Sequence, residues 1–547
     1  MRRPDSRGLS LRHFVGAAAV ALLAALVFAP ALGSFFVADD FFLLDAVVSG
    51  GPFGAWPRDT SFFRPLASAS LWLDHRAWGL VPLPFHATNL VLHFLATLAA
   101  ASAARRLVAR FGAREEEASR AGLLTGLFFL LLPAHAEPVN WISARPDLLA
   151  GLFALAALAL ALRHEETGKP SAALLSAALF AASLLSKESG ATWPLVAFLL
   201  LVPPPQGGLR TRGARLLAPS LLVLVLLAYL PLRAALLGGL VRGYGEGVHL
   251  DLSPLLLGDN LLRFLGRSLV PHVGLAESLG SALGSALAAA TLPRVETWMD
   301  RGAGLFVLAA AFALALRGRG AVQRLALPAL GAFLVASLPA AYLGIGASGP
   351  QGERFLYLPS FFAALAVASA VSSARFPARR NIAALLLVAA WGGALVAANL
   401  SWRAAGELSR TIVFSLRGAP AAEETLLLAL PDNVRGAYVV RTFLPRALAL
   451  FGQEKAWGRT AVLASTDLAR PDARVDAIRT GECWETTPGR GARIRALIPP
   501  PPGSGLELSP GPGGGYRACE VPVRASRRWA VVSGGAVVVL ASPGEGR

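Results

Sequence analysis

Charged residues are scarce in this sequence. They make up 16% of its 547 residues, whereas about a quarter is usual for a soluble domain. Hydrophobic residues make up 54%, and they form long runs without the periodicity of a half-buried strand or helix. The runs 216–237, 325–343 and 382–400 approach the ~20 residues that a helix needs to cross a bilayer. The sequence therefore excludes a soluble protein and predicts a polytopic membrane protein.

Lysine is nearly absent, there are two cysteines, and no tandem repeat is visible. The formal net charge is +17, but the arginines lie in short loops between apolar runs, where they orient a membrane protein. We therefore expect no nucleic-acid partner. Cys483 and Cys519 both fall in the C-terminal part, and we expect a disulfide between them if that part lies outside the cytosol. Two free thiols are the alternative.

The apolar runs predict about eleven transmembrane helices. Their expected ranges are 14–32, 85–104, 121–141, 148–162, 172–185, 191–202, 216–237, 305–316, 325–343, 355–371 and 382–400. Every second connection between them is rich in arginine, and such connections face the cytoplasm. The N-terminus is then cytoplasmic and the C-terminus is periplasmic, in a multi-pass protein of a bacterial inner membrane. A cleaved signal peptide is the alternative for the first run, and it leaves the later orientation unchanged.

Two external connections are long, at 33–84 and 238–304. They contain proline-broken amphipathic stretches, for which we expect short helices on the membrane surface at 65–78 and 254–269. Together with the spans they form a membrane domain, 1–400.

The composition changes after Leu400. Segments 425–430, 436–440 and 529–540 have the β-branched and apolar character of strands, and 499–515 is rich in proline and glycine, as in a linker. We therefore predict a second domain over 401–547. The expected fold class is an all-α polytopic membrane bundle with a small C-terminal α/β extracytoplasmic domain.

Polar motifs recur at the ends of the apolar runs, all on the external side of this topology. They are Asp39-Asp40, the stretch from His135 to Trp141, Arg145-Pro146-Asp147, Lys187-Glu188 and Glu353-Arg354. Ionisable groups at a bilayer edge are costly to keep there, so a function is their first explanation. We expect them to surround one externally open site.

Asp39 and Asp40 directly follow the first run. Adjacent carboxylates in a medium of low dielectric constant repel each other and resist ionisation, which raises the pKa of at least one. A carboxylate tuned in this way suits a general base that takes a proton from a hydroxyl group. The alternative is a helix cap, a common role of aspartate.

Polar residues also lie within and before the second run. His86, Asn89 and His93 share one helix face, and hydrogen bonding between helices is favoured over metal binding for them. Arg64, in the preceding external connection, either binds an anion or extends to the interface as a surface arginine.

The densest cluster joins the third and fourth runs. It contains His135, Glu137, Trp141, Arg145 and Asp147. Glu137 or Asp147 would orient an acceptor or bind a cation, and Arg145 would pair with a phosphate. The alternative is a helical hairpin held by an ion pair of Arg145 with Asp147 or Glu137.

Two further motifs each combine an acid with a base. Lys187 and Glu188 form either an internal ion pair or a ligand contact. Arg354 is placed for a lipid phosphate, with Glu353 holding it, because a guanidinium group matches phosphate oxygens. A plain Glu–Arg pair is the alternative for this motif.

Taken in order, these motifs resemble those of a known family. The matching stretches are Asp39-Asp40, Phe63-Arg64-Pro65-Leu66, His86-x-x-Asn89-x-x-x-His93, Pro133-x-His135-x-Glu137, Trp141-x-Ser143-x-Arg145-x-Asp147, Ser186-Lys187-Glu188 and Glu353-Arg354-Phe355-Leu356-Tyr357. The series is similar to the transmembrane and tetratricopeptide-repeat O-mannosyltransferases, and more broadly to the C-type membrane glycosyltransferases. This sequence departs from the family at its C-terminus, where a cysteine-containing domain replaces the repeats.

The resemblance implies a glycosyltransferase that moves a sugar, with a mannose-like hexose favoured, from a polyprenyl-phosphate carrier such as undecaprenyl phosphate. The expected acceptor is a hydroxyl group of a protein or glycan on the outer face. Asp39 then maps as the catalytic base and Asp40 as its neighbour. Arg354, with Arg145 and Lys187, holds the phosphate. A phosphate leaving group requires no metal, although His135 and Glu137 leave room for a divalent cation.

A transporter or flippase of a lipid-linked sugar is the alternative function. It predicts polar residues at mid-membrane and internal repeats. The charges here cluster at one interface instead, which favours the enzyme.

Overall fold

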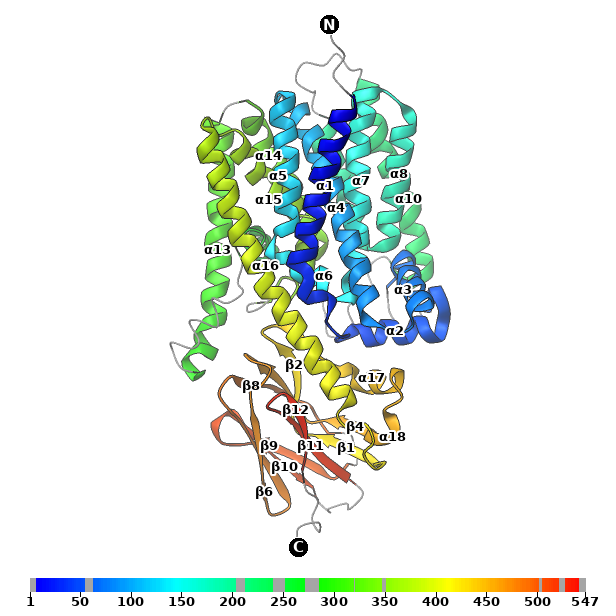
Figure 1. The fold of residues 1–547 in the computed structure, drawn as a ribbon, viewed down its shortest axis with the longest axis vertical. Coiled ribbons are helices and arrows are strands. Elements are labelled where there is room, and N and C mark those ends of the chain that lie inside the picture. The colour runs from blue at the N-terminus through cyan, green and yellow to red at the C-terminus, as the bar shows by residue number, and fades with distance from the viewer. Residues whose placement is uncertain are drawn as a thin grey trace.

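The structure is a computed structural model that describes residues 6–54, 62–202, 212–239, 251–270, 285–318, 320–346, 351–500, 504–520 and 527–540. A bundle of long helices occupies one part of the molecule, and a group of β-sheets lies against one end of it (Figure 1). The short helices α2 (Asp39–Gly50) and α3 (Pro65–Trp78) lie at that same end. The bundle and the sheets thus meet where the polar motifs are.

The bundle is built from apolar helices of very different lengths. They are α1 (Ser6–Leu32), α4 (Pro82–Arg110), α5 (Glu115–Leu131), α6 (Ala136–Asn140), α7 (Arg145–Thr167), α8 (Pro170–Ser186), α9 (Trp193–Leu201), α10 (Arg212–Leu237), α11 (Pro254–Arg267), α13 (Ser285–Arg317), α14 (Gly320–Ala341), α15 (Ser360–Ser372) and α16 (Pro377–Phe414). Among the described residues, six helices are long and apolar enough to cross a membrane, and a seventh span results if α5 and the following bent segment are one span. This identifies a multi-pass membrane protein.

Each predicted span coincides with an apolar helix. Three of these, Pro170–Ser186, Glu188–Leu201 and Ser360–Ser372, are shorter than a full crossing, so the number eleven stays a prediction. The third predicted span is bent by 56° at Pro133, because a proline removes a backbone donor and its ring clashes with the preceding turn. The bend ends the apolar helix and brings the short, buried α6 to the site.

Helices are present at both positions where surface helices are expected, and their place on the membrane surface stays a prediction. The structure has α3 over Pro65–Trp78 and α11 over Pro254–Arg267, each starting at a proline, which suits the first turn of a helix. Parts of the long connections at 33–84 and 238–304 lie outside the described residues.

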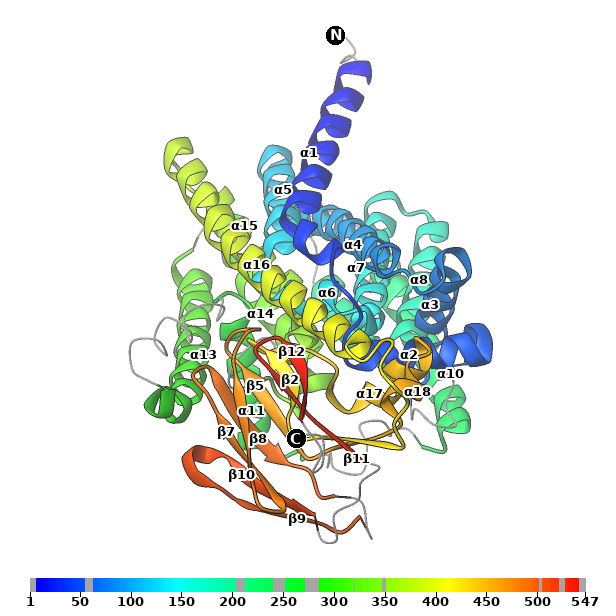
Figure 2. The same ribbon diagram turned by 60° about the horizontal axis from the view of Figure 1, so that its bottom comes forward.

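The last helix does not end at the predicted domain boundary. α16 is 38 residues long and continues without a break from Pro377 past Leu400 to Phe414. It therefore leaves the bundle and packs along the first sheets of the C-terminal part (Figures 1 and 2).

The C-terminal domain contains three four-stranded sheets. Their strand orders are β12-β11-β1-β4, β6-β7-β10-β9 and β3-β2-β5-β8. The strands are β1 (Glu424–Leu427), β2 (Leu430–Val434), β3 (Ala437–Tyr438), β4 (Arg459–Val462), β5 (Ala464–Leu468), β6 (Val475–Thr480), β7 (Cys483–Pro488), β8 (Ala492–Leu497), β9 (Leu506–Pro510), β10 (Tyr516–Glu520), β11 (Arg527–Ser533) and β12 (Ala536–Leu540). The short helices α17 (Leu444–Leu450) and α18 (Glu454–Trp457) complete it, and α17 packs against α2.

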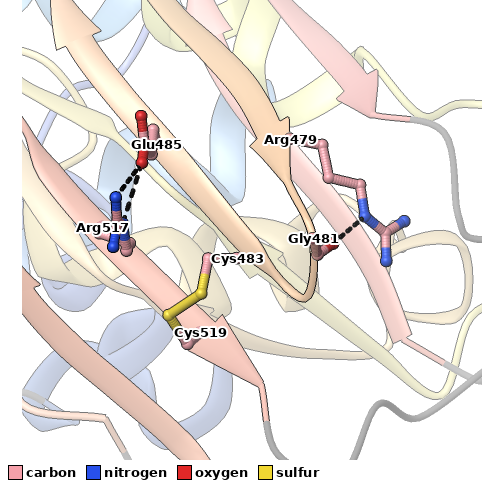
Figure 3. The surroundings of a disulfide bond; sticks show 6 residues. All are labelled: Arg479, Gly481, Cys483, Glu485, Arg517 and Cys519. Carbon is pink, nitrogen blue, oxygen red and sulfur yellow. Dashed lines mark hydrogen bonds and ion pairs between the residues drawn. A yellow bond between two sulfur atoms is a disulfide. The ribbon is translucent and has the colours of Figure 1, made fainter.

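Two predictions for this domain meet different outcomes. Cys483 and Cys519 form a disulfide between neighbouring positions of β7 and β10 (Figure 3). The segment 499–515, expected to be a linker, instead contains β9, which pairs with β10 in antiparallel register. The prediction of a linker was wrong there because backbone pairing with β10 outweighs the local proline and glycine content.

Candidate active site

The acidic pair opens α2 at the meeting point of bundle and sheets. Asp40 is fully buried, and its Oδ1 accepts hydrogen bonds from the backbone N and the Oγ of Ser143, both at 2.7 Å. Its Oδ2 accepts one from the backbone N of Val37 at 3.0 Å. Burial raises the pKa of Asp40 to about 7, against these hydrogen bonds. Asp40 thus fastens the start of α2 to the segment before α7. It is not the cap of the alternative interpretation, because Ala38 holds the N-cap position of α2 and no side chain caps the helix there.

Asp39 differs from its neighbour. Its side chain is half-buried, and among the described residues its carboxylate makes no hydrogen bond or ion pair. Burial raises the pKa of Asp39, and the positive charges of Arg441 and Arg354 oppose that rise. A carboxylate with a raised pKa and unengaged oxygens can accept a proton.

Arg354 is held in position by Glu137. It lies in the 3-10 helix η5 (Glu353–Leu356), and its backbone N and its Nη1 both donate to the Glu137 carboxylate at 2.6 Å. Its guanidinium carbon lies 4.9 Å from the centre of the Trp141 ring and 4.6 Å from that of Phe355. The side chain is 19% exposed, so part of this pre-positioned cation remains open to a ligand.

A small cavity, with a volume of about 20 Å³, lies beside Arg354. Its lining combines Asp147, Ser189 and Arg354 with Phe355 and an apolar wall of Ala336, Pro339, Ala340, Leu358 and Pro359. Lys187 Nζ pairs with Asp147 Oδ1 at 2.6 Å and lies 5.3 Å from the centre of the Phe355 ring. A charged edge thus lies next to an apolar wall.

The structure corrects the expectation for Arg145. This side chain is fully buried, and its guanidinium group donates to Asn89 Oδ1, Ser70 Oγ and the Phe85 carbonyl and pairs with Asp74 at 2.6 Å. Its donors are therefore used inside the protein, and it is not available to a donor phosphate. Neither of the ion pairs considered for it, with Asp147 or with Glu137, forms.

Glu353 also has a partner other than the expected one. It pairs with Arg267 of α11 at 3.2 Å, and Arg267 in turn forms two hydrogen bonds of 3.0 Å with Asp300 of α13. Burial raises the pKa of Glu353 to about 7, although Arg267 opposes it. Glu353 therefore ties η5 to α11 and α13, while Glu137 takes the predicted role of holding Arg354.

The remaining predicted residues divide into two groups. Arg64 and Glu188 form an ion pair of 2.5 Å at the edge of the site, in place of a Lys187–Glu188 pair. His86 is buried in α4, and the ring of His135 packs on Tyr357 and hydrogen-bonds Ser360 at 2.9 Å. These two histidines lie in the interior, where they support the helices.

Two site residues escaped the sequence analysis. Tyr438 of β3 packs edge-to-face against Trp141 with ring centres 4.8 Å apart and is hydrogen-bonded with Arg354. Arg441 of η6 (Arg441–Phe443) is the cation with the larger effect on the pKa of Asp39. Both lie in the C-terminal domain, whose sequence contains no motif that signals a site.

These groups combine an acid with a raised pKa, Asp39, and a fixed cation, Arg354. The cavity lined by Asp147 and Phe355 lies beside Arg354. Among the residues that the structure describes, no group of three or more His, Cys, Asp or Glu side chains is arranged to hold a metal ion.

Comparison with curated proteins finds relatives over part of the chain. The sequence is 33% identical over 162 residues to Protein O-mannosyl-transferase Tmtc1 of Drosophila melanogaster, covering 29% of this chain. It is 33% identical over 201 residues to Protein O-mannosyl-transferase Tmtc2 of the same organism, covering 32% of this chain. The sequence resemblance to the O-mannosyltransferases is confirmed. The chain spans 17% and 20% of these relatives' own lengths, and no protein-family model matches it.

Comparison with solved structures gives two alignments over most of the chain. ArnT from Cupriavidus metallidurans, solved with undecaprenyl phosphate, aligns with a TM-score of 0.42 and 14% identity over 83% of this chain and 93% of its own. The archaeal oligosaccharyltransferase AglB from Archaeoglobus fulgidus, solved with an inhibitory peptide and a dolichol-phosphate, aligns with a TM-score of 0.42 and 12% identity over 89% and 76%.

Proposed function

We propose that this protein is a membrane glycosyltransferase that moves a sugar, with a mannose-like hexose favoured, from a polyprenyl-phosphate carrier to an acceptor hydroxyl on the extracytoplasmic face. The observation that supports this most strongly is the unengaged carboxylate of Asp39 close to the pre-positioned cation Arg354. The similarity to O-mannosyl-transferases supports the choice of sugar.

The proposed reaction is a single inverting displacement. The acceptor oxygen attacks the anomeric carbon and forms the new glycosidic bond, while the bond from that carbon to the carrier phosphate breaks. The acceptor proton passes to Asp39, and the phosphate leaves with the bonding electron pair. General-base catalysis of this kind contributes roughly 10²–10⁴-fold to a rate.

Arg354 would stabilise the departing phosphate. Charge develops on the phosphate oxygens as the bond breaks, and a fixed cation that needs no reorganisation stabilises that charge best. The two hydrogen bonds to Glu137 fix Arg354 before substrate arrives. Lys187, which pairs with Asp147 of the cavity lining, would add positive charge near the phosphate, and the reaction includes no step at a metal ion.

A labelled donor tests the proposal. Purified protein in lipid is given polyprenyl-phosphate mannose with a radiolabelled sugar and a membrane-protein extract as acceptor, and the label transferred is measured. We expect transfer by the wild type and a loss of about 10²-fold or more in Asp39→Asn, because the amide cannot take the proton.

Asp45→Asn is the matched control. Asp45 lies in the same helix but is exposed and pairs only with Arg446 at 2.7 Å among the described residues. This variant should keep the wild-type rate. Movement of labelled donor across the bilayer without transfer to any acceptor, or full activity in Asp39→Asn, would overturn the proposal.

A further inference from the structure

The C-terminal domain touches the residue directly before the acidic pair. The backbone N of Ala38 donates to the carbonyl of Val439 at 2.6 Å. Val439 follows Tyr438 of β3, and its own N donates to the Asp432 carbonyl of β2 at 3.0 Å. The hairpin of β2 and β3 therefore holds the start of α2 by a backbone hydrogen bond.

Tyr438 brings an aromatic platform into the same place. Its side chain is buried, and its ring lies 4.8 Å from that of Trp141 and 5.8 Å from that of Trp402. Its hydroxyl is hydrogen-bonded with Arg354, whose guanidinium group lies over Trp141. The hairpin thus contacts the groups assigned to the donor phosphate.

Arg441 lies over the ring of this tyrosine. Its guanidinium carbon is 4.7 Å from the centre of the Tyr438 ring, and its Nε donates to Asp432 Oδ1 at 3.0 Å. These two contacts fix its charge relative to the hairpin, and hence relative to Asp39.

Backbone strain marks both sides of the contact. Among the described residues, only three that are not glycine have a positive φ, and two of them are Ala38 at 46° and Arg441 at 54°. Such conformations persist where the surrounding structure holds them, and they are concentrated at functional sites.

We propose that Arg441 is a positioning residue that the C-terminal domain supplies to the active site, where its fixed positive charge keeps the carboxylate of Asp39 ready to accept a proton. The inference rests on the proposed function and extends it. It assigns to the domain after α16 a part in catalysis, because the membrane domain alone lacks this charge.

The charges around Asp39 favour this assignment. Those that act on it or on its direct neighbours are Asp40 of α2, Arg354 of η5, Glu137 of α6, Arg145 of α7, Asp432 of β2 and Arg441 of η6. Burial raises the pKa of Asp39, and of the two cations that oppose this rise Arg441 has the larger effect. Removing Arg441 should therefore move the pKa of Asp39 further upward.

The pH dependence of sugar transfer tests this prediction. For Arg441→Gln we expect the acid limb of the kcat/KM profile to lie at higher pH than in the wild type, and for Arg441→Lys we expect it to return toward the wild-type position. Arg446→Gln is the matched control, because it removes an exposed ion pair between the same domain and α2 without changing the charge near Asp39. A profile in Arg441→Gln that is lowered equally at every pH would show a merely structural role and overturn the inference.

A second measurement does not depend on activity. The carboxyl group of Asp39 is labelled with a water-soluble carbodiimide and an amine across a range of pH, and the labelled peptide is quantified by mass spectrometry. In Arg441→Gln, labelling of Asp39 should extend to higher pH than in the wild type or in Arg446→Gln, and identical labelling curves would overturn the inference. If the wild type transfers no sugar but labelling of Asp39 still shifts between the wild type and Arg441→Gln, the result would count against the proposed function alone.

Discussion

Glu137 accepts two hydrogen bonds from one residue, Arg354, through its backbone N and its Nη1, each 2.6 Å long. The two residues are 217 positions apart, on the bent end of a span and on the turn before α15. A buried carboxylate with this geometry fixes both the position and the orientation of the guanidinium group. The resulting cation is the centre of the anion-binding side of the site.

This relationship predicts how donor binding responds to substitution. Arg354→Lys should raise the donor KM by roughly 10–100-fold, because a charge-assisted hydrogen bond contributes about 1.5–3 kcal/mol. Glu137→Gln should raise it by a smaller factor, since the amide oxygen still accepts from the backbone. Steady-state kinetics with varied polyprenyl-phosphate mannose gives the values. Glu353→Gln is the control and should leave the donor KM unchanged, because Glu353 pairs with Arg267; equal KM values in all variants would contradict the role of Arg354.

Arg145 should matter for stability and not for donor binding. Arg145→Gln removes one partner of the buried pair with Asp74, which typically costs about 3–5 kcal/mol. We expect a lower midpoint of thermal unfolding in detergent and an unchanged donor KM in the protein that remains folded. Arg446→Gln, which breaks an exposed pair, should cost about 0.2–1 kcal/mol. An unchanged midpoint with weakened donor binding in Arg145→Gln would instead make it a phosphate ligand.

Asp40 should make the protein less stable as pH rises. Burial raises its pKa in the folded protein to about 7 from an ordinary value of 3.8, so between these values the folded state holds a proton that the unfolded state has lost. The stability contributed by the protonated form is complete below about pH 4 and is lost as pH rises through about 7, by about 4 kcal/mol in total.

Unfolding midpoints across this pH range test that effect. Asp40→Asn does not titrate, so its midpoint should fall less between pH 5 and pH 8 than that of the wild type, whereas Asp45→Asn should keep the wild-type slope. Glu353, whose pKa burial also raises to about 7, contributes in the same direction and keeps some slope in every variant. Parallel curves for Asp40→Asn and the wild type would contradict the prediction.

The disulfide should stabilise the C-terminal domain alone. Cys483 and Cys519 are 36 positions apart, and a cross-link over such a loop contributes about 2–4 kcal/mol. Replacing both cysteines by serine should make the domain unfold and be cleaved by protease at a lower temperature. Transfer at a temperature where the domain stays folded should be retained, because β7 and β10 belong to a different sheet from the hairpin at the site. Loss of transfer by folded protein would show that the bond also shapes the site.

The membrane part of the fold was largely predictable, because apolar runs and prolines determine where helices start and end. Pro65 and Pro254 begin α3 and α11 at the positions expected. The boundary at Leu400 was less predictable, since α16 continues past it and buries Trp402, Leu408 and Ile412 through tertiary contacts.

The sequence predicted most of the residues that form the site, but not which of them pair with each other. The sequence placed Asp39, Glu137 and Arg354 at one membrane face, and the structure brings them together. It could not show that Arg145 pairs with Asp74, or that Glu353 pairs with Arg267, because these partners lie 71 and 86 positions away and their contacts depend on tertiary packing. Arg441 was missed for the same reason.

The unbroken course of α16 has a mechanical consequence. A helix turns by about 100° and advances about 1.5 Å with each residue. The orientation of the C-terminal sheets about the helix axis therefore depends on the number of residues between the bundle and Phe414. One alanine inserted after Arg403 would rotate the sheets about the axis of α16. A whole turn of inserted residues would restore their orientation but move them further from the bundle. The length of the helix therefore fixes both the distance and the orientation of the sheets relative to the bundle.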